Sequence, residues 1–162
     1  MKKQLHPGAK WSWRIGFYFF GILITLSLLI FSISAKQSWA FYLFLTIILI
    51  VILIAEIYTR LAYANWFYEF AENQLRLERG IIWKRYSNIP YERIQNVDIT
   101  RGIIARILGF STVMIQTAGF SHTPNQNFLA EGYIPAVSAS EAEHIREFLM
   151  KKISKRGREQ GL

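Results

Sequence analysis

Four basic side chains lie close together in the middle of the sequence, on either side of a glycine. Arginine and lysine bind phosphate oxygens and other anions, and each basic group near an anionic membrane surface adds about 1 kcal/mol to binding. The cluster therefore predicts contact with lipid headgroups or with a partner, and ordinary solvated strand faces are the alternative interpretation. Its members are Arg76, Arg79, Lys84 and Arg85.

The residues that most often perform catalysis do not form a catalytic pattern. Ser111 lies outside a GxSxG turn, and Glu141 and Glu143 fit better as favourable charges at the start of a helix. The glycines form neither GxGxxG nor a phosphate-binding loop, so no cofactor is expected, and no HExxH metal motif is present. The sequence predicts a protein that is not an enzyme. We interpret the three histidines as solvated side chains: His6, His122 and His144.

Composition and charge narrow the class of protein. The chain has 162 residues, no cysteine and a formal net charge of +8, which suits about one domain without disulfides or thiolate metal sites. A basic protein can bind nucleic acid or an anionic membrane. No helix carries the clustered arginines of a groove-reading element, so nucleic acid is not an expected partner. The apolar residues are concentrated before Tyr58, which favours the membrane.

Two long apolar runs lie in the first third of the chain. The first run, 15–33, has 19 residues and no charge. The second run, 39–55, has 17, and the next three residues extend it to Tyr58. A helix needs roughly 20 residues to cross the hydrocarbon core of a bilayer. A signal peptide has a shorter apolar region, and a core helix of a soluble protein has a polar face. The sequence predicts transmembrane helices at 15–33 and 39–58.

The distribution of basic residues predicts the orientation. Only residues 34–38 join the two runs, so they form an antiparallel hairpin whose turn holds Lys36 alone. The positive-inside rule therefore predicts a basic cytoplasmic segment at 1–14, an extracytoplasmic turn at 34–38 and two cytoplasmic termini. The basic residues at the open end are Lys2, Lys3, Lys10, Arg14 and Arg60.

One acidic residue lies near a span. Glu56 and Arg60 are four positions apart at the end of the second run, which is favourable spacing for an ion pair on a helix. We interpret them as a surface pair, although charges within membranes are more often functional.

Beyond Tyr63 the pattern changes to short alternating runs, which predict about seven mostly antiparallel strands. Asn88–Pro90 and Pro135 are expected to break strands, and the polar segment 119–127 is the expected mobile loop. The candidate strands are 63–70, 74–79, 81–87, 94–100, 111–118 and 128–137.

Two helical segments complete the predicted domain. Residues 102–109 suit one helical turn closed by Gly109. Ser138 with Glu141 forms a capping box, with Ser140 and Glu143 as the alternative, before an amphipathic helix. The segment from 63 to 153 is therefore expected to be a small barrel or sandwich covered by a helix, followed by a basic tail at 154–162. The fold class is α+β, mainly β.

The ordered pieces LERGIIWKRYSNIP, IQNV, RILG and IQTAG resemble the signature of the bacterial membrane-flanked pleckstrin-homology-like (PH-like) domains of the YdbS family. The two apolar runs before a single domain are also similar to that family. The resemblance implies a PH-like barrel with a C-terminal helix in a bacterial cytoplasmic membrane. It implies no settled activity. It also implies a partner, because these proteins often accompany a longer membrane relative that carries several copies of the domain.

Three classes of function remain open at this point. The leading hypothesis is a non-catalytic membrane protein whose cytoplasmic domain binds a partner protein, assembles with itself, or contacts the inner leaflet. The alternative is a lipid-handling or envelope-stress component that binds anionic headgroups through the basic cluster. An enzyme would need a pocket with an acid or base of shifted pKa.

Overall fold

The computed structural model describes residues 2–35, 38–117 and 132–159, and the chain divides into two compact units. One is a helical unit, Lys10–Leu61. The other is a β-rich domain formed by Ala62–Leu162 together with Met1–Ala9. The whole predicted loop 119–127, with His122, lies outside the described residues. The first four residues of the predicted strand 128–137 lie outside them as well.

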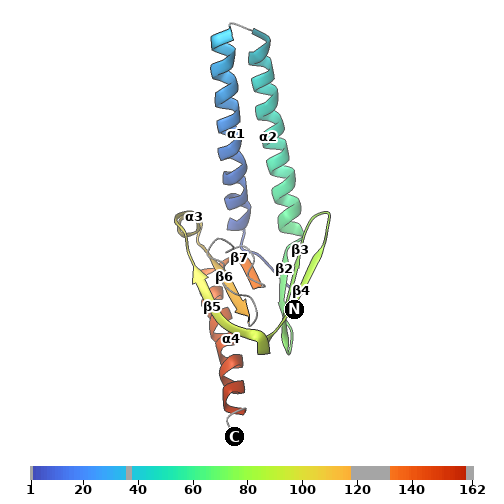
Figure 1. The fold of residues 1–162 in the computed structure, drawn as a ribbon, viewed down its shortest axis with the longest axis vertical. Helices are drawn as coiled ribbons and strands as arrows, with labels where there is room; N and C mark the ends of the chain where they lie inside the picture. Colours follow the sequence, from blue (N-terminus) through green and yellow to red (C-terminus); the bar gives the residue numbers. More distant parts are fainter. Residues whose placement is uncertain (1, 36–37, 118–131, 160–162) are drawn as a thin grey trace. The chain divides into compact units, whose positions relative to one another are not determined.

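Two long helices run through the apolar part of the chain (Figure 1). Helix α1 spans Gly8–Ala35 and α2 spans Ser38–Ala64, so both extend beyond the predicted spans. Each is long and apolar enough to cross a membrane, and few of its residues are buried by protein. Exposed apolar side chains along both helices argue against the core of a soluble protein, whose helices would be covered.

The two helices approach closely at one glycine. A Cβ atom on Gly21 would lie 2.6 Å from Val51 Cγ1, so a side chain at position 21 would separate the helices. The buried hydroxyls of Thr25 and Thr59 donate hydrogen bonds of 2.8 and 2.7 Å to carbonyl oxygens one turn earlier. Each of these two hydroxyls is therefore satisfied within its own helix, which suits lipid surroundings.

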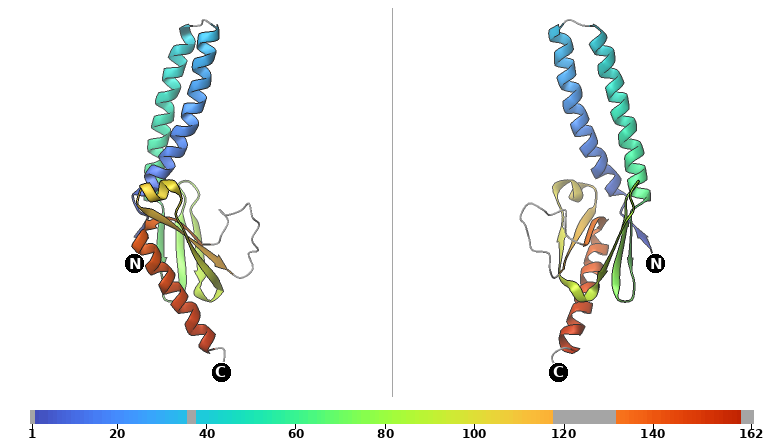
Figure 2. Two further views of the ribbon diagram at one scale, coloured as in Figure 1. Left: turned by 90° about the vertical axis from the view of Figure 1, so that its left-hand side faces the viewer. Right: turned by 45° about the vertical axis from the view of Figure 1, so that its right-hand side comes forward.

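The β-rich domain consists of two antiparallel sheets (Figure 2). Strands β1 (Lys3–Gln4), β2 (Phe67–Phe70), β3 (Gln74–Arg79) and β4 (Arg85–Pro90) form the first sheet in that order. Strands β5 (Ile94–Thr100), β6 (Phe110–Thr117) and β7 (Gly132–Ser138) form the second sheet. The short helix η1 (Tyr91–Arg93) joins the sheets. Helix α3 (Ile103–Ile107) lies between β5 and β6, and α4 (Ala139–Glu159) follows β7.

The core lies between the sheets and against α4. Alternation along β3 buries Leu75 and Leu77, and alternation along β6 buries Val113 and Ile115, as the sequence predicts for half-covered strands. Helix α4 packs mainly against β5, η1 and β6. The mainly β fold with a closing helix, expected from the sequence, is confirmed. The α4 residues that enter the core are Ala142, Ile145 and Leu149.

Gly132 allows the two sheets to meet. It pairs with Ile115 in the second sheet, and a Cβ atom at position 132 would lie 2.7 Å from Ile115 Cβ. The same atom would lie 2.9 Å from Ile89 Cδ1, which belongs to the first sheet. Only a residue without a side chain leaves room for this contact between sheets.

The caps of the two shorter helical segments follow the sequence. Gly109 has φ +74 immediately after the last turn of α3, a conformation that favours glycine. The backbone N–H of Glu141 donates a 3.2 Å hydrogen bond to Ser138 Oγ, which confirms Ser138 as the cap of α4. The Glu141 carboxylate accepts a hydrogen bond from Lys3 Nζ.

Several strand boundaries differ from the prediction. The strand predicted at 63–70 begins only at Phe67, because Tyr63 and Ala64 continue α2. Residues 81–84, of which the first three are apolar, form a turn, and β4 begins at Arg85 and continues through Asn88 and Pro90. Strand β7 likewise continues past Pro135, opposite a shift in register in β6. Proline has no N–H to donate to the hydrogen bonds between strands. The shift in register between β6 and β7 accommodates Pro135. The carbonyl of Pro135 instead accepts a 2.8 Å hydrogen bond from the Thr112 hydroxyl.

The residues before α1 belong to the β-rich domain, which the sequence pattern did not predict. Strand β1 pairs with β2, and Leu5 is buried, with its carbonyl accepting a 2.8 Å hydrogen bond from Tyr63 Oη. The interpretation of His6 as a solvated residue is wrong. It is half-buried beside Phe110, and its Nδ1 accepts a hydrogen bond from the Gly8 N–H.

Candidate functional site

The structure separates the four predicted basic residues into two groups. Arg79 and Arg85 are directly opposite each other where β3 and β4 meet their connecting turn. Arg76 is on the other face of β3, opposite Asn88, because side chains alternate along a strand. Lys84 Nζ lies 3.6 Å from Oε1 of Glu78, and Glu78 is on the same face of β3 as Arg76. The predicted cluster is therefore one arginine pair and two separate cations.

The arginine pair is electrostatically unfavourable in the absence of an anion. Burial lowers the pKa of Arg79 from its ordinary value, and the charge of Arg85 lowers it further. Like charges directly opposite each other destabilise an antiparallel pair of strands. A negatively charged group near Arg79 and Arg85 would relieve this repulsion.

The turn between β3 and β4 exposes two large apolar side chains. We call residues Gly80–Lys84 the hairpin tip. Ile82 is 88% exposed and Trp83 is 77% exposed. Gly80 has φ +118, and a Cβ atom there would lie 2.0 Å from the Trp83 carbonyl oxygen, so the tip depends on glycine. The sequence pattern was interpreted as a strand, but a glycine followed by apolar residues and Lys84 also indicates an exposed turn.

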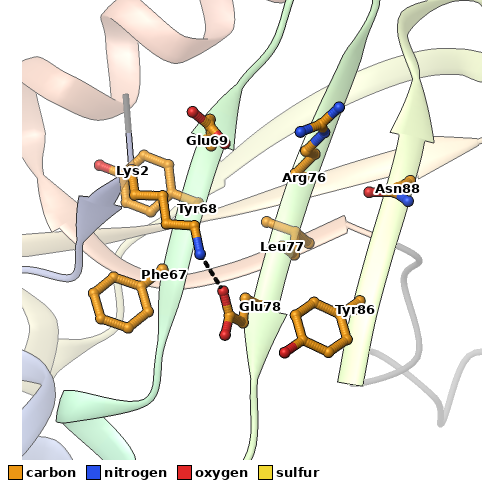
Figure 3. A pocket seen from close by; sticks show the side chains of 9 residues that line it. All are labelled: Lys2, Phe67, Tyr68, Glu69, Arg76, Leu77, Glu78, Tyr86 and Asn88. Atoms are coloured by element: carbon orange, nitrogen blue, oxygen red, sulfur yellow. Dashed lines mark hydrogen bonds and ion pairs between the residues drawn. The ribbon is translucent and has the colours of Figure 1, made fainter. Parts of the chain in front are cut away.

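The outer face of the first sheet contains a shallow hollow of about 360 Å³ (Figure 3). We call it the sheet hollow. The Phe67 and Tyr86 rings lie on either side of Glu78, and Arg76 lies between Glu69 and Asn88. Tyr86 is 64% exposed. The residues that line the sheet hollow are Lys2, Phe67, Tyr68, Glu69, Arg76, Leu77, Glu78, Tyr86 and Asn88.

One of the two carboxylates that line the sheet hollow, that of Glu78, is paired with lysine. Lys2 Nζ donates a 2.7 Å hydrogen bond to Glu78 Oε2, and Lys84 lies near the other carboxylate oxygen. The hydrogen bond from Lys2 lowers the pKa of Glu78 from its ordinary value. Glu78 is therefore ionised at neutral pH, which suits recognition of a polar surface better than proton transfer.

The other candidate catalytic residues are dispersed. Ser111 is buried within β6, and Glu141 and Glu143 are bonded to Lys3 and Arg146. His144 lies exposed on α4, in agreement with its interpretation as solvated. Among the described residues, no three histidine, aspartate or glutamate side chains come together in a way that could hold a metal ion.

A polar cluster joins the two long helices, and it adds a second and shorter contact to the predicted pair of Glu56 with Arg60. Glu56 Oε2 accepts a 2.7 Å hydrogen bond from Arg14, which lies on the other helix. Tyr18 Oη is 3.3 Å from Oε1 of the same carboxylate, and Arg60 Nε is only 3.6 Å from Oε2. The Arg14 side chain is 17% exposed and that of Arg60 is 76% exposed. The main partner of Glu56 is therefore Arg14.

Comparison with known proteins identifies the relatives of the chain. It is 29% identical over 89 residues to the UPF0699 transmembrane protein YdbT of Bacillus subtilis, and 28% identical over 86 residues to the UPF0699 transmembrane protein YdbS of the same organism. The matched regions cover 55% and 53% of this chain. They cover only 17% of YdbT and 48% of YdbS, so the chain spans less than half of either relative. No solved structure matches.

The family model named Bacterial PH domain matches residues 15–153, which include most of α1, all of α2, strands β2 to β7 and most of α4. This agrees with the resemblance to membrane-flanked PH-like domains that the ordered motifs carry. The chain belongs to the bacterial PH domain family.

Proposed function

We propose that this protein is a non-catalytic membrane anchor that presents the sheet hollow to a partner protein on the cytoplasmic side of the membrane. One observation carries the proposal. The outer face of the first sheet exposes aromatic side chains beside an arginine and an amide, and these are combined in a shallow hollow. Tyrosine, phenylalanine and arginine are enriched in protein interfaces, where they contribute much of the binding energy.

The partner that we propose is a longer membrane protein of the same family. YdbT is such a relative, since the matched part of this chain covers 17% of its length and its name describes a transmembrane protein. Self-association through the same hollow is the competing form of assembly. Each copy of the chain carries a net charge of +8, and the repulsion between two such copies disfavours the homo-oligomer.

The cytoplasmic location is part of the same proposal. Basic residues before α1 and near the end of α2 outnumber the single lysine of the connecting turn, which supports a hairpin with both ends inside. The domain is then attached to the membrane at both Ala9 and Ala62, the residues where the chain passes to the helical unit. Two attachments limit its distance from the bilayer, which raises its local concentration near membrane partners.

Substitutions in the sheet hollow test the proposed interface. We expect the double variant Tyr86→Ala with Arg76→Ala to reduce co-purification of the longer relative from native membranes by about tenfold or more, as expected for the loss of two interface anchors. Both side chains are exposed, so the domain should keep its melting temperature. Cross-linking followed by quantitative mass spectrometry measures the partner.

The matched control is Arg146→Ala on α4, which removes another exposed arginine far along the chain. It should leave co-purification unchanged. Equal recovery of the relative with the control and the double variant would contradict the proposed interface. Recovery of a second tagged copy of this chain, lost in the double variant, would contradict the proposed partner and favour self-association.

A further inference from the structure

The β-rich domain exposes two apolar tips. The hairpin tip carries Ile82 and Trp83, both more than three-quarters exposed. The second tip is α3, on which Ile103 is 79% exposed and Ile107 is 78% exposed. We call these α3 residues the helix tip. Soluble proteins seldom combine such exposed apolar side chains at one end of a domain unless that end contacts a protein or a membrane.

Both tips are at the end of the domain where the chain passes to the apolar helices. Strand β2 starts at Phe67, directly after α2, and Phe67 pairs with Glu78 just before the hairpin tip. A Cβ atom on Gly8 would lie 2.6 Å from Phe110 Cδ1 and 3.3 Å from Leu108 O, at the end of the helix tip. Each tip therefore lies beside one of the two attachment points.

Chain length brings this end of the domain to the membrane surface. Helix α2 ends at Ala64, six residues after the end of the predicted span at Tyr58, and six helical residues extend about 9 Å. The polar layer on each side of a bilayer is about 5–8 Å thick. Side chains beside Ala64 can therefore reach the headgroup region without any rearrangement of the domain.

The charges around both tips suit an anionic surface. Arg79 and Arg85 flank the hairpin tip, which itself contains Lys84. Arg101 precedes α3, and Arg106 lies within it. Tryptophan prefers the interface between water and lipid, and basic side chains beside it bind lipid phosphates. An anionic headgroup between Arg79 and Arg85 would also relieve the repulsion of two opposed arginines.

We propose that the hairpin tip and the helix tip insert together into the inner leaflet of the membrane that the helices cross, and that anionic lipid holds them there. This contact fixes the face of the domain that is directed away from the bilayer. It goes beyond the protein-binding role of the sheet hollow and does not depend on that role. It also goes beyond the cluster of four basic residues predicted from the sequence, because the contact includes the apolar side chains of both tips.

Fluorescent labels at single cysteines test the insertion. The chain has no cysteine, so Ile82→Cys, Ile107→Cys and Glu72→Cys each accept one environment-sensitive label in the full-length protein. Glu72 is exposed in the turn between β2 and β3, at the opposite end of those strands, and serves as the control. The labelled proteins are placed in nanodiscs of phosphatidylcholine with about 30% phosphatidylglycerol, which gives an anionic surface.

Labels at positions 82 and 107 should show blue-shifted emission and at least about threefold weaker quenching by aqueous iodide than the label at position 72, because lipid excludes the quencher. Adding Arg79→Gln with Arg85→Gln should restore quenching at position 82, whereas Arg146→Gln should not. Equal quenching at positions 72, 82 and 107 would overturn the proposal. Protection that persists unchanged after the arginine substitutions would also overturn it, because anionic lipid would then not hold the tips.

Discussion

Gly132→Val is expected to destabilise the β-rich domain strongly. Position 132 faces the core. A Cβ atom added there would lie only 2.7 Å from Ile115 Cβ and 2.9 Å from Ile89 Cδ1. These residues belong to different sheets, so relief of the overlap requires the sheets to separate. Overpacking of this kind costs about 3 kcal/mol, which would lower the melting temperature of a domain of this size by about 10 °C or more.

Thermal unfolding of the full-length protein in detergent, followed by near-ultraviolet circular dichroism, measures this effect. Gly132→Ala should have a smaller effect in the same direction, because alanine adds only the Cβ atom. Gly102→Ala is the matched control, since no atom lies within 4 Å of its added methyl group. A melting temperature for Gly132→Val equal to that of Gly102→Ala would show that the sheets do not meet at this glycine.

The second large effect is expected at the polar cluster of the helical hairpin. Glu56→Gln should destabilise the pairing of α1 with α2 by about 2 kcal/mol, because it leaves the weakly exposed guanidinium of Arg14 without its anionic partner. Arg14→Gln should have an effect of similar size. Arg60→Gln should cost no more than about 0.5 kcal/mol, because an exposed pair at 3.6 Å contributes little.

A double-mutant cycle separates the contact from other effects of the substitutions. Unfolding of the variants in mixed micelles should give a coupling energy between Arg14 and Glu56 of about 1 kcal/mol or more. The cycle for Arg60 and Glu56 provides the comparison. A coupling for Arg14 no larger than that for Arg60 would mean that the helices are not joined by this hydrogen bond.

Features that depend on local periodicity could be predicted from the sequence. Alternation places Leu75 and Leu77 in the core, and the glycine at position 109 ends a helical turn with a positive φ. The cap at Ser138 also depends only on neighbouring residues. The ordered family motifs predict how these local elements are arranged in one fold. The match of the Bacterial PH domain model to residues 15–153 agrees with that prediction.

Features that depend on pairing between distant residues could not be predicted. Strand β1 has two residues and exists only because β2 is beside it, so no periodicity marks it. The apolar run after Gly80 fits a strand and an exposed turn equally well by composition. The opposition of Arg79 and Arg85 requires the register of β3 and β4. The bond between Arg14 and Glu56 requires the packing of two helices.

The proposed partner and the proposed lipid contact share one requirement, which is that the β-rich domain faces the cytoplasm. Glu72→Cys in this domain and Gln37→Cys in the predicted extracytoplasmic turn provide single sites for a maleimide that does not cross membranes, because the chain has no other cysteine. In spheroplasts with an intact cytoplasmic membrane, we expect the reagent to modify the cysteine at position 37. We expect it to modify the cysteine at position 72 only after lysis. Modification of position 72 in intact cells, with protection of position 37, would contradict the account.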